Sequence, residues 1–406
     1  MALVIRRWGY FALLLAPVFW TALEWARLGI TGQLWNAMGY SQAYHPQLIQ
    51  AATWGGVYAV SFLILAINSS IALLIFKRTR WTIAAALLVM LCVWLVATKS
   101  QSKQRTSYSA DPGLVEVVAL QPNVPMTLVK SVEETKALLE RHLSLSKHSL
   151  QSVTSYSPRL VVWPESPMNF TYGSDRTFQE LVATFTRENH TSLLFNSLET
   201  APANGAYNSA LLVNEEGRLI SQYDKIRLMP FGEYVPLPQW LPGASLISGI
   251  VGDFTPGTKY TVMPVGERRI GVFICIESAY PWIARRLVSE GADGLINISN
   301  DGYLGPTAVM RQHLGNAIFR AVENGTPLLR VTNTGLSASI ASDGRIEELT
   351  EGFVTDAKVW PLRKSKANST FYTRHGDLFV QVCAVLTLLV VVATLFSRRR
   401  SFRDLR

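Results

Sequence analysis

Cysteine is scarce in this chain, with three in 406 residues: Cys92, Cys275 and Cys383. The first and the last lie inside long apolar runs, so Cys275 has no disulfide partner in the polar middle of the sequence. No spacing of Cys and His matches a zinc site, and no Walker loop or GxGxxG motif precedes an expected helix. The sequence therefore predicts no structural disulfide, no metal and no cofactor.

Acidic residues are outnumbered, with 29 Asp and Glu against 38 Lys and Arg and a formal net charge of +9. The basic residues cluster beside apolar segments, at residues 6–7, 77–80 and 398–400. This placement is typical of membrane orientation and not of a surface that binds nucleic acid. With 49% apolar residues, the chain is predicted to contact a membrane bilayer and to bind no nucleic acid.

Four apolar segments predict membrane-crossing helices, at residues 8–28, 52–76, 81–98 and 378–396. The first is apolar to residue 23 and continues past Glu24 and Arg27, which share one helix face and could pair. A signal peptide is the alternative for this segment, although no convincing cleavage site follows it.

The basic clusters give one consistent membrane topology, because cytoplasmic segments carry excess Lys and Arg. We expect an N-terminal membrane region at 1–100 with about three helices and a domain outside the cytoplasm at 101–370. A C-terminal transmembrane helix at 378–396 then returns the chain to a basic cytoplasmic tail at 397–406.

Residues 110–365 alternate short apolar segments, typical of buried strands, with amphipathic segments typical of helices. Ser131 and Glu134 form the pattern of a capping box before one of these helices. Two layers of sheet between helices would bury the apolar strands, so we predict the α/β class.

Three strand-like segments are followed by an ionisable residue. Leu160–Trp163 leads to Glu165, Leu219–Tyr223 leads to Lys225, and Ile270–Ile274 leads to Cys275. Alone, each residue has a structural explanation: a carboxylate at a helix start, a surface lysine and a small buried thiol. Because reacting groups gather at the carboxyl ends of strands, together they predict a base, a cation and a nucleophile for acyl transfer.

Glu165, Lys225 and Cys275 resemble the Glu-Lys-Cys triad of the nitrilase, or carbon–nitrogen hydrolase, superfamily. FGEYVP at 231–236 and the segment 297–335 resemble more narrowly the apolipoprotein N-acyltransferases. The resemblance implies an αββα nitrilase-like sandwich flanked by transmembrane α-helices. It also implies a bacterial inner-membrane protein with a periplasmic catalytic domain and a cytoplasmic C-terminus.

The residues suggest thiol acylation, with Glu165 as general base and Cys275 as nucleophile. Lys225 and the backbone N–H after Cys275 would form the oxyanion hole. The resemblance implies that the acyl chain passes from a phospholipid, through a Cys275 thioester, to the α-amino group of the lipid-modified N-terminal cysteine of a diacylglyceryl lipoprotein. It also implies that Glu233 supports Lys225 and the base, and that Glu277 is the acidic residue two positions after the nucleophile. We expect a monomer.

Two stretches are candidates for substrate binding. The aromatic loop at 29–50 contains Trp35 and Tyr40, which could line a lipid entrance or form an ordinary interfacial belt. Residues 237–262 are rich in Pro, Gly and apolar residues and contain Trp240 and Leu246. This segment is predicted to be a lid or a membrane-dipping arm, or alternatively a loop packed on its own domain.

The sequence departs from the acyltransferase pattern in two places. Several more membrane helices usually precede the stretch where this chain begins, so a form with a shortened N-terminal membrane region is one interpretation. Ile276 stands after the nucleophile, where Tyr is frequent. Two alternatives to the acyltransferase function stay open. The chain could be a membrane-anchored nitrilase-type amidase with water as acceptor, or it could be a non-catalytic lipoprotein-binding relative.

Overall fold

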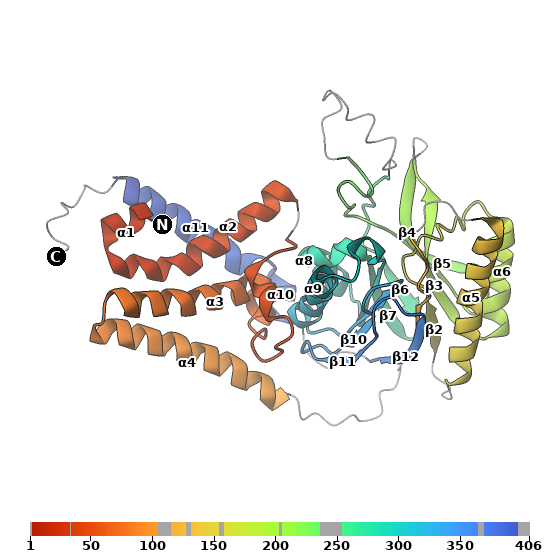
Figure 1. The fold of residues 1–406 in the computed structure, drawn as a ribbon, viewed down its shortest axis with the longest axis horizontal. Helices are drawn as coiled ribbons and strands as arrows, with labels where there is room; N and C mark the ends of the chain where they lie inside the picture. Colours follow the sequence, from red (N-terminus) through yellow and green to blue (C-terminus); the bar gives the residue numbers. More distant parts are fainter. Residues whose placement is uncertain are drawn as a thin grey trace. The chain divides into compact units, whose positions relative to one another are not determined.

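The computed structural model describes residues 2–32, 34–103, 115–126, 131–153, 158–202, 205–235, 254–363 and 369–396. The chain divides into two compact units. The helical unit comprises Met1–Tyr108, Val322–Gly325 and Ser369–Arg406, and the sheet unit comprises Ser109–Ala321 and Thr326–Asn368. Figure 1 shows the membrane-type helices in the first and the strands in the second.

The helical unit contains α1 (Ala2–Trp8), η1 (Tyr10–Leu15), α2 (Ala16–Thr31), η2 (Met38–Gln42), α3 (Ala52–Phe76), α4 (Arg80–Lys103), α10 (Phe371–His375) and α11 (Leu378–Phe396). Among the described residues, three segments are long and apolar enough to cross a membrane: Tyr10–Ile30, Ala52–Phe76 and Leu378–Phe396. The remaining predicted crossing lies in α4, where the shorter segment Arg80–Cys92 is apolar. That four helices cross the membrane therefore stays a prediction.

Helix α3 is interrupted near its start, where Gly56 has φ +64° and ψ −165°. After the break, the backbone N–H of Val57 donates to Oε1 of Glu323 at 2.9 Å. A carboxylate at a helix start satisfies a free N–H group and interacts favourably with the helix dipole. A Cβ at Gly56 would lie 2.8 Å from the ring of Tyr372, so glycine permits both the turn and the close approach of α10.

The first sheet of the described sheet unit has six strands in the order β12-β1-β2-β3-β4-β5. They are β1 (Val115–Gln121), β2 (Arg159–Val162), β3 (Ser192–Thr200), β4 (Ala206–Val213), β5 (Leu219–Asp224) and β12 (Asp356–Leu362). Strands β1, β2 and β3 are parallel, and antiparallel strands flank them on both sides.

The second sheet in the described residues also has six strands, in the order β11-β10-β9-β8-β7-β6. They are β6 (Val262–Val265), β7 (Arg268–Ile274), β8 (Gly294–Ser299), β9 (Leu328–Thr332), β10 (Ala338–Ile340) and β11 (Ile346–Leu349). Strands β7, β8 and β9 are parallel, so their carboxyl ends lie at one edge of the sheet.

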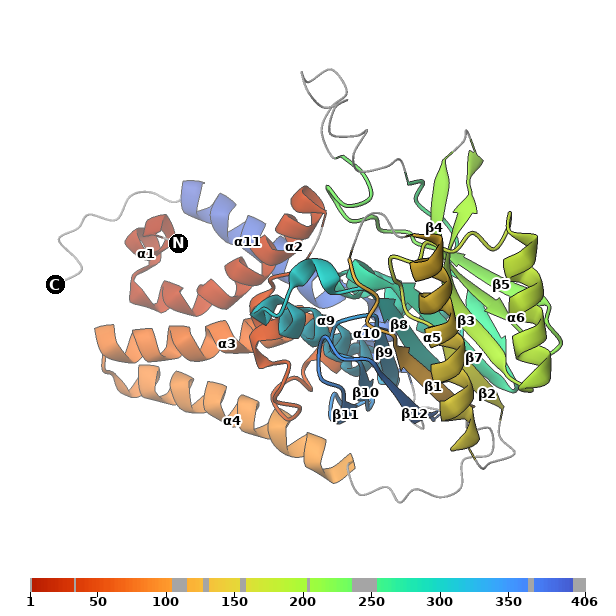
Figure 2. The same cartoon turned by 45° about the vertical axis from the view of Figure 1, so that its right-hand side comes forward.

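Helices cover the two sheets on their outer sides. The first sheet packs against α5 (Val132–Gln151) and α6 (Arg176–Glu188), as Figure 2 shows. The second is accompanied by η4 (Cys275–Ala279), α8 (Pro281–Ser289), η5 (Gly302–Leu304) and α9 (Ala308–Asn324). The predicted αββα sandwich is confirmed.

The predicted capping box at the start of α5 also forms. Ser131 Oγ accepts from Glu134 N at 3.1 Å, and Glu134 Oε2 accepts from Ser131 N at 2.8 Å.

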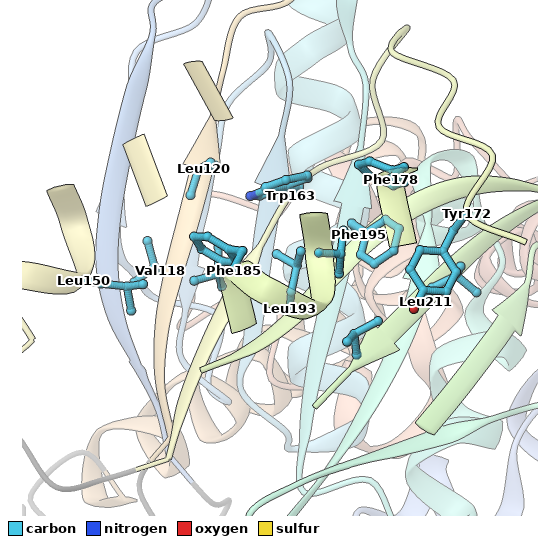
Figure 3. Packing of buried hydrophobic residues seen from close by; sticks show 13 residues of the cluster. Val118, Leu120, Leu150, Trp163, Tyr172, Phe178, Phe185, Leu193, Phe195 and Leu211 are labelled. Carbon is cyan, nitrogen blue, oxygen red and sulfur yellow. The ribbon is translucent and has the colours of Figure 1, made fainter. Parts of the chain in front are cut away.

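Trp163 lies at the centre of the core between the first sheet and its helices (Figure 3). Its indole packs against Phe185 and Phe195, and Nε1 donates to Ser146 Oγ at 3.0 Å. Burying a large apolar side chain fully contributes about 1.5–3 kcal/mol. Because Trp163 directly follows β2, this packing fixes the backbone two residues before Glu165.

Candidate active site

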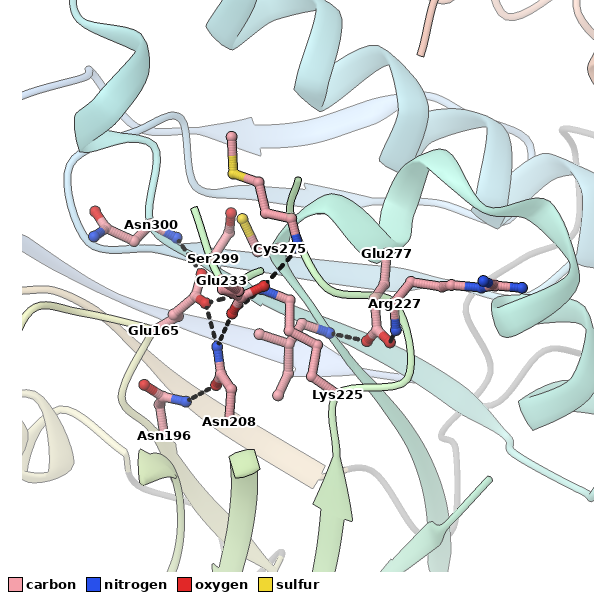
Figure 4. A network of polar contacts seen from close by, with 12 residues as sticks. Glu165, Asn196, Asn208, Lys225, Arg227, Glu233, Cys275, Glu277, Ser299 and Asn300 are labelled. Carbon is pink, nitrogen blue, oxygen red and sulfur yellow. Dashed lines mark hydrogen bonds and ion pairs between the residues drawn. The ribbon is translucent and has the colours of Figure 1, made fainter. Parts of the chain in front are cut away.

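Three side chains that follow strands meet in the sheet unit. The Nζ of Lys225 donates to Oε1 of Glu165 at 3.2 Å, and Cys275 lies beside them (Figure 4). The first sheet supplies the carboxylate after β2 and the ammonium after β5, and the second sheet supplies the thiol after β7. The structure thus brings together the three residues that the sequence selects.

Lys225 is buried, with a side chain 2% exposed, and it lies between two carboxylates. Besides Glu165, its Nζ donates to Oε1 of Glu233 at 2.9 Å. Burial alone would lower the pKa of Lys225, but Glu165 and Glu233 raise it well above the usual value. Lys225 is therefore positively charged at neutral pH.

Glu233 is held in a turn that positions it against Lys225. Its Oε2 accepts from the backbone N–H of Met229 at 2.7 Å, and its own N–H donates to the Met229 carbonyl at 2.8 Å. Burial opposes ionisation, but the charge and hydrogen bond of Lys225 lower the pKa of Glu233. The structure therefore places Glu233 against Lys225, as the resemblance implies.

Asn208 on β4 links the two carboxylates and is a residue that the sequence reasoning missed. Its Nδ2 donates to Glu165 Oε1 at 2.9 Å and to Glu233 Oε1 at 2.6 Å. Its Oδ1 accepts from Asn196 Nδ2 at 2.7 Å, which fixes the orientation of the amide. The sequence feature that points to Asn208 is a polar residue inside a largely apolar strand. Such a residue is buried when the strand is buried, and a buried polar group needs a hydrogen-bond partner.

The second oxygen of Glu165 has a partner from the second sheet. Its Oε2 accepts from the backbone N–H of Asn300 at 3.2 Å, directly after β8. The Glu165 side chain is 14% exposed, so it is largely shielded from water. Both oxygens are therefore oriented before any substrate arrives.

Cys275 stands at the junction of β7 and η4 and is buried. Burial and the nearby Glu165 raise the pKa of the thiol to about 12, and Lys225 partly opposes this rise. The thiol is therefore protonated at neutral pH, and its reaction requires transfer of the proton to a base.

Glu277 is fully buried and binds two stretches of backbone. Burial raises its pKa to about 7, and hydrogen bonds from backbone N–H groups oppose the rise. Glu277 ties the segment after Lys225 to the residue before Cys275. Its donors are the hydroxyl of Tyr223 at 2.8 and 2.9 Å and the N–H groups of Ile226 at 2.7 Å, Arg227 at 3.0 Å and Ile274 at 2.7 Å.

The predicted substrate-binding residues are placed unevenly. Trp35 and Tyr40 are half-buried in the helical unit, and Trp240 and Leu246 lie outside the described residues. Within the sheet unit, Tyr303 is 68% exposed. Glu165 and Cys275 interact with it electrostatically, so Tyr303 lies at the margin of the site. In the part of the chain that the structure describes, no group of three or more His, Cys, Asp and Glu could hold a metal ion.

Comparison with known proteins gives two family matches. Residues 117–353 match the carbon–nitrogen hydrolase family, and residues 1–70 match the N-terminal domain of apolipoprotein N-acyltransferase. A protein of Geobacter metallireducens named apolipoprotein N-acyltransferase is 33% identical, over 99% of this chain and 78% of that protein. A Thermotoga maritima protein with the same name is 30% identical, over 97% of this chain and 72% of that protein. Among solved structures, Saccharomyces cerevisiae Nit3, of the nitrilase superfamily, has 18% identity and a TM-score of 0.49 over 64% of this chain and 93% of that one.

Proposed function

This chain belongs to the apolipoprotein N-acyltransferases of the carbon–nitrogen hydrolase family, and from that membership we propose a residue-level mechanism. In this mechanism, an acyl chain passes from a phospholipid through Cys275 to the α-amino group of a diacylglyceryl lipoprotein. The observation that carries the proposal is the buried Lys225, which pairs with Glu165 and Glu233 beside Cys275.

In the first half-reaction, Glu165 accepts the proton of the Cys275 thiol as the sulfur attacks the ester carbonyl of the phospholipid. Lys225 Nζ and the N–H of Ile276 stabilise the negative charge on the carbonyl oxygen. The carbon–oxygen bond then breaks, and Glu165 returns the proton to the leaving lysophospholipid oxygen. The products are lysophospholipid and a thioester on Cys275.

In the second half-reaction, the α-amine of the lipoprotein attacks the thioester carbonyl and gives a proton to Glu165. The carbon–sulfur bond breaks, the proton goes to the sulfur and an amide forms. The same base and oxyanion hole serve both halves, so the two substrates share one site in turn and the kinetics are ping-pong.

The raised thiol pKa of Cys275, about 12, supports a role for Glu165 as base. A thiol with this pKa holds its proton until a carboxylate removes it next to bound substrate. Lys225 keeps its charge throughout, because the pKa of its ammonium is held well above the usual value beside Glu165 and Glu233. Lys225 therefore contributes electrostatic stabilisation and not proton transfer.

The apolar helices agree with substrates that reside in a membrane. We propose that the domain at 101–370 lies on the periplasmic side of the inner membrane and that the tail at 397–406 is cytoplasmic. Reporter fusions at residue 236 and after residue 406 test this orientation. Periplasmic activity of the first fusion and cytoplasmic activity of the second are expected, and the reverse pattern would contradict the assignment.

A two-step transfer experiment tests the proposed function. The full chain in detergent is incubated with phospholipid carrying a labelled acyl chain, freed of lipid and then given a diacylglyceryl-cysteine peptide. We expect the label to move from protein to the peptide amine in one turnover. Release of labelled free fatty acid with no acylated peptide would instead favour the amidase-type alternative with water as acceptor.

A further inference from the structure

We propose that His313 is a positioning residue that orients and polarises the peptide group between Cys275 and Ile276. This inference rests on the proposed function, in which the N–H of that peptide group belongs to the oxyanion hole. His313 lies on α9, and its imidazole Nε2 is 3.1 Å from the backbone carbonyl oxygen of Cys275.

The backbone at Cys275 needs such support. Its φ is +52°, in the left-handed region that residues other than glycine rarely occupy. A conformation of this kind costs of order 1 kcal/mol and persists when surrounding contacts hold it. Hydrogen bonds fix both sides of the turn, because Ile274 N–H donates to Glu277 at 2.7 Å and the Cys275 carbonyl contacts His313.

The geometry of the peptide bond connects this contact to catalysis. The carbonyl of Cys275 and the N–H of Ile276 belong to one planar trans peptide, so they point in opposite directions. A hydrogen bond that fixes the carbonyl on the His313 side therefore also fixes the direction of the N–H on the other side. It also strengthens the N–H as a donor, because hydrogen bonds in a chain polarise one another by about 10–30% per bond.

The proton on His313 is assigned by its partner. A backbone carbonyl only accepts hydrogen bonds, so Nε2 must carry hydrogen. On the other side of the ring, Nδ1 lies 2.9 Å from Arg330 Nη2 and 2.9 Å from Asp301 Oδ1. These two contacts hold the ring from behind whichever of them Nδ1 uses, so Nε2 stays directed at the Cys275 carbonyl.

Arg330 is buried and orients both His313 and Asn297. Its Nη1 donates to Oδ1 of Asn297, whose Nδ2 donates to the Phe273 carbonyl at 3.2 Å and lies 3.5 Å from the Cys275 carbonyl. Asp301 holds Arg330 with both carboxylate oxygens, each 2.9 Å from Nη2. The chain from Asp301 through Arg330 to His313 and Asn297 is thus a rigid support behind the nucleophile.

The test compares His313→Leu, which has no donor, with His313→Gln, whose amide can donate in place of Nε2. His142→Leu is the matched control, because His142 is also fully buried in the sheet unit but bonds to the Leu138 carbonyl within α5. Direct loss of an oxyanion donor costs about 10²–10³ in rate, so an indirect loss should slow thioester formation about tenfold. We expect thioester formation to be about tenfold slower in His313→Leu, and we expect His313→Gln and His142→Leu to retain most of the wild-type rate.

A spectroscopic readout separates positioning from folding. In protein acylated from a ¹³C-carbonyl phospholipid, the thioester carbonyl stretch reports hydrogen bonds in the oxyanion hole. We expect the band to move to higher frequency in His313→Leu and to stay in place in His313→Gln. A folded His313→Leu variant with wild-type rate and band would overturn the inference. Failure of the wild type to form the thioester would instead refute the proposed function.

If His313→Leu does not fold, the ¹⁵N resonances of the His313 ring in the labelled full chain decide the point. The inference requires a protonated Nε2. A proton-free Nε2 facing the Cys275 carbonyl would overturn it.

Discussion

The side-chain amide of Asn208 lies 2.9 Å from Oε1 of Glu165 and donates to it. The same Nδ2 lies 2.6 Å from Oε1 of Glu233, so one amide separates two carboxylates that also share Lys225. Asn208 therefore reduces repulsion between the proposed base and its neighbour, and it limits the positions that Glu165 can take.

Substitution Asn208→Asp should place a third carboxylate in this cluster. Like charges favour protonation, so this carboxylate cluster should hold a proton up to higher pH, and the acidic limb of the pH–rate profile of thioester formation should move to higher pH. We expect the rate at pH 7 to fall at least about tenfold. Asn214→Asp, in the turn between β4 and β5, is the control for added charge. An unshifted acidic limb in Asn208→Asp would contradict the assigned role.

Alkylation of Cys275 by iodoacetamide should be slow and strongly pH-dependent. Burial, the largest cause, and Glu165 raise the thiol pKa to about 12, whereas free cysteine is near 8.5. The thiolate fraction should therefore keep rising up to about pH 12. At pH 8, peptide-level mass spectrometry should show labelling at least about a hundredfold slower than for free cysteine.

The same experiment tests the electrostatic influence of Glu165. Removing its charge in Glu165→Gln should lower the pKa of Cys275 and increase labelling at pH 8, even though acyl transfer is lost. Glu290→Gln, which removes an exposed carboxylate beyond α8, should leave the labelling rate unchanged. Equal labelling of wild type and Glu165→Gln across the pH range would show that Glu165 does not control the thiol.

Glu323 should stabilise the restarted part of α3 in the helical unit. Its Oε1 accepts from Val57 N–H at 2.9 Å, and loss of such a cap costs about 0.5–2 kcal/mol. We expect Glu323→Ala to lower the midpoint of thermal unfolding in detergent, and Glu323→Gln to lower it less because an amide oxygen still accepts. Equal midpoints for all three proteins would exclude the capping role.

Much of the sheet unit follows from local sequence pattern. Apolar segments of four to eight residues predict buried strands, and Glu165, Lys225 and Cys275 could be selected because each closely follows such a segment. The capping box of Ser131 and Glu134 involves residues three apart, so it too is visible in the sequence. These features are determined by residues that lie close together in the sequence.

The features that were missed depend on pairing across the fold. Asn208 reaches Glu165 through the pairing of β3 with β4, and His313 reaches Cys275 from a helix that begins well after β8. Glu323 caps a helix start 266 residues earlier in the chain. The break at Gly56 lies inside an apolar run that reads as one continuous crossing. No local periodicity encodes such contacts.

If Cys275 carries the acyl chain as a thioester, the intact mass of the full chain should change on incubation with phospholipid. We expect a mass increase of one acyl group that neutral hydroxylamine removes, that peptide mapping places on Cys275 and that Cys275→Ala lacks. Transfer activity retained by folded Cys275→Ala, or an acyl group mapped to another residue, would show that Cys275 is not the acyl carrier.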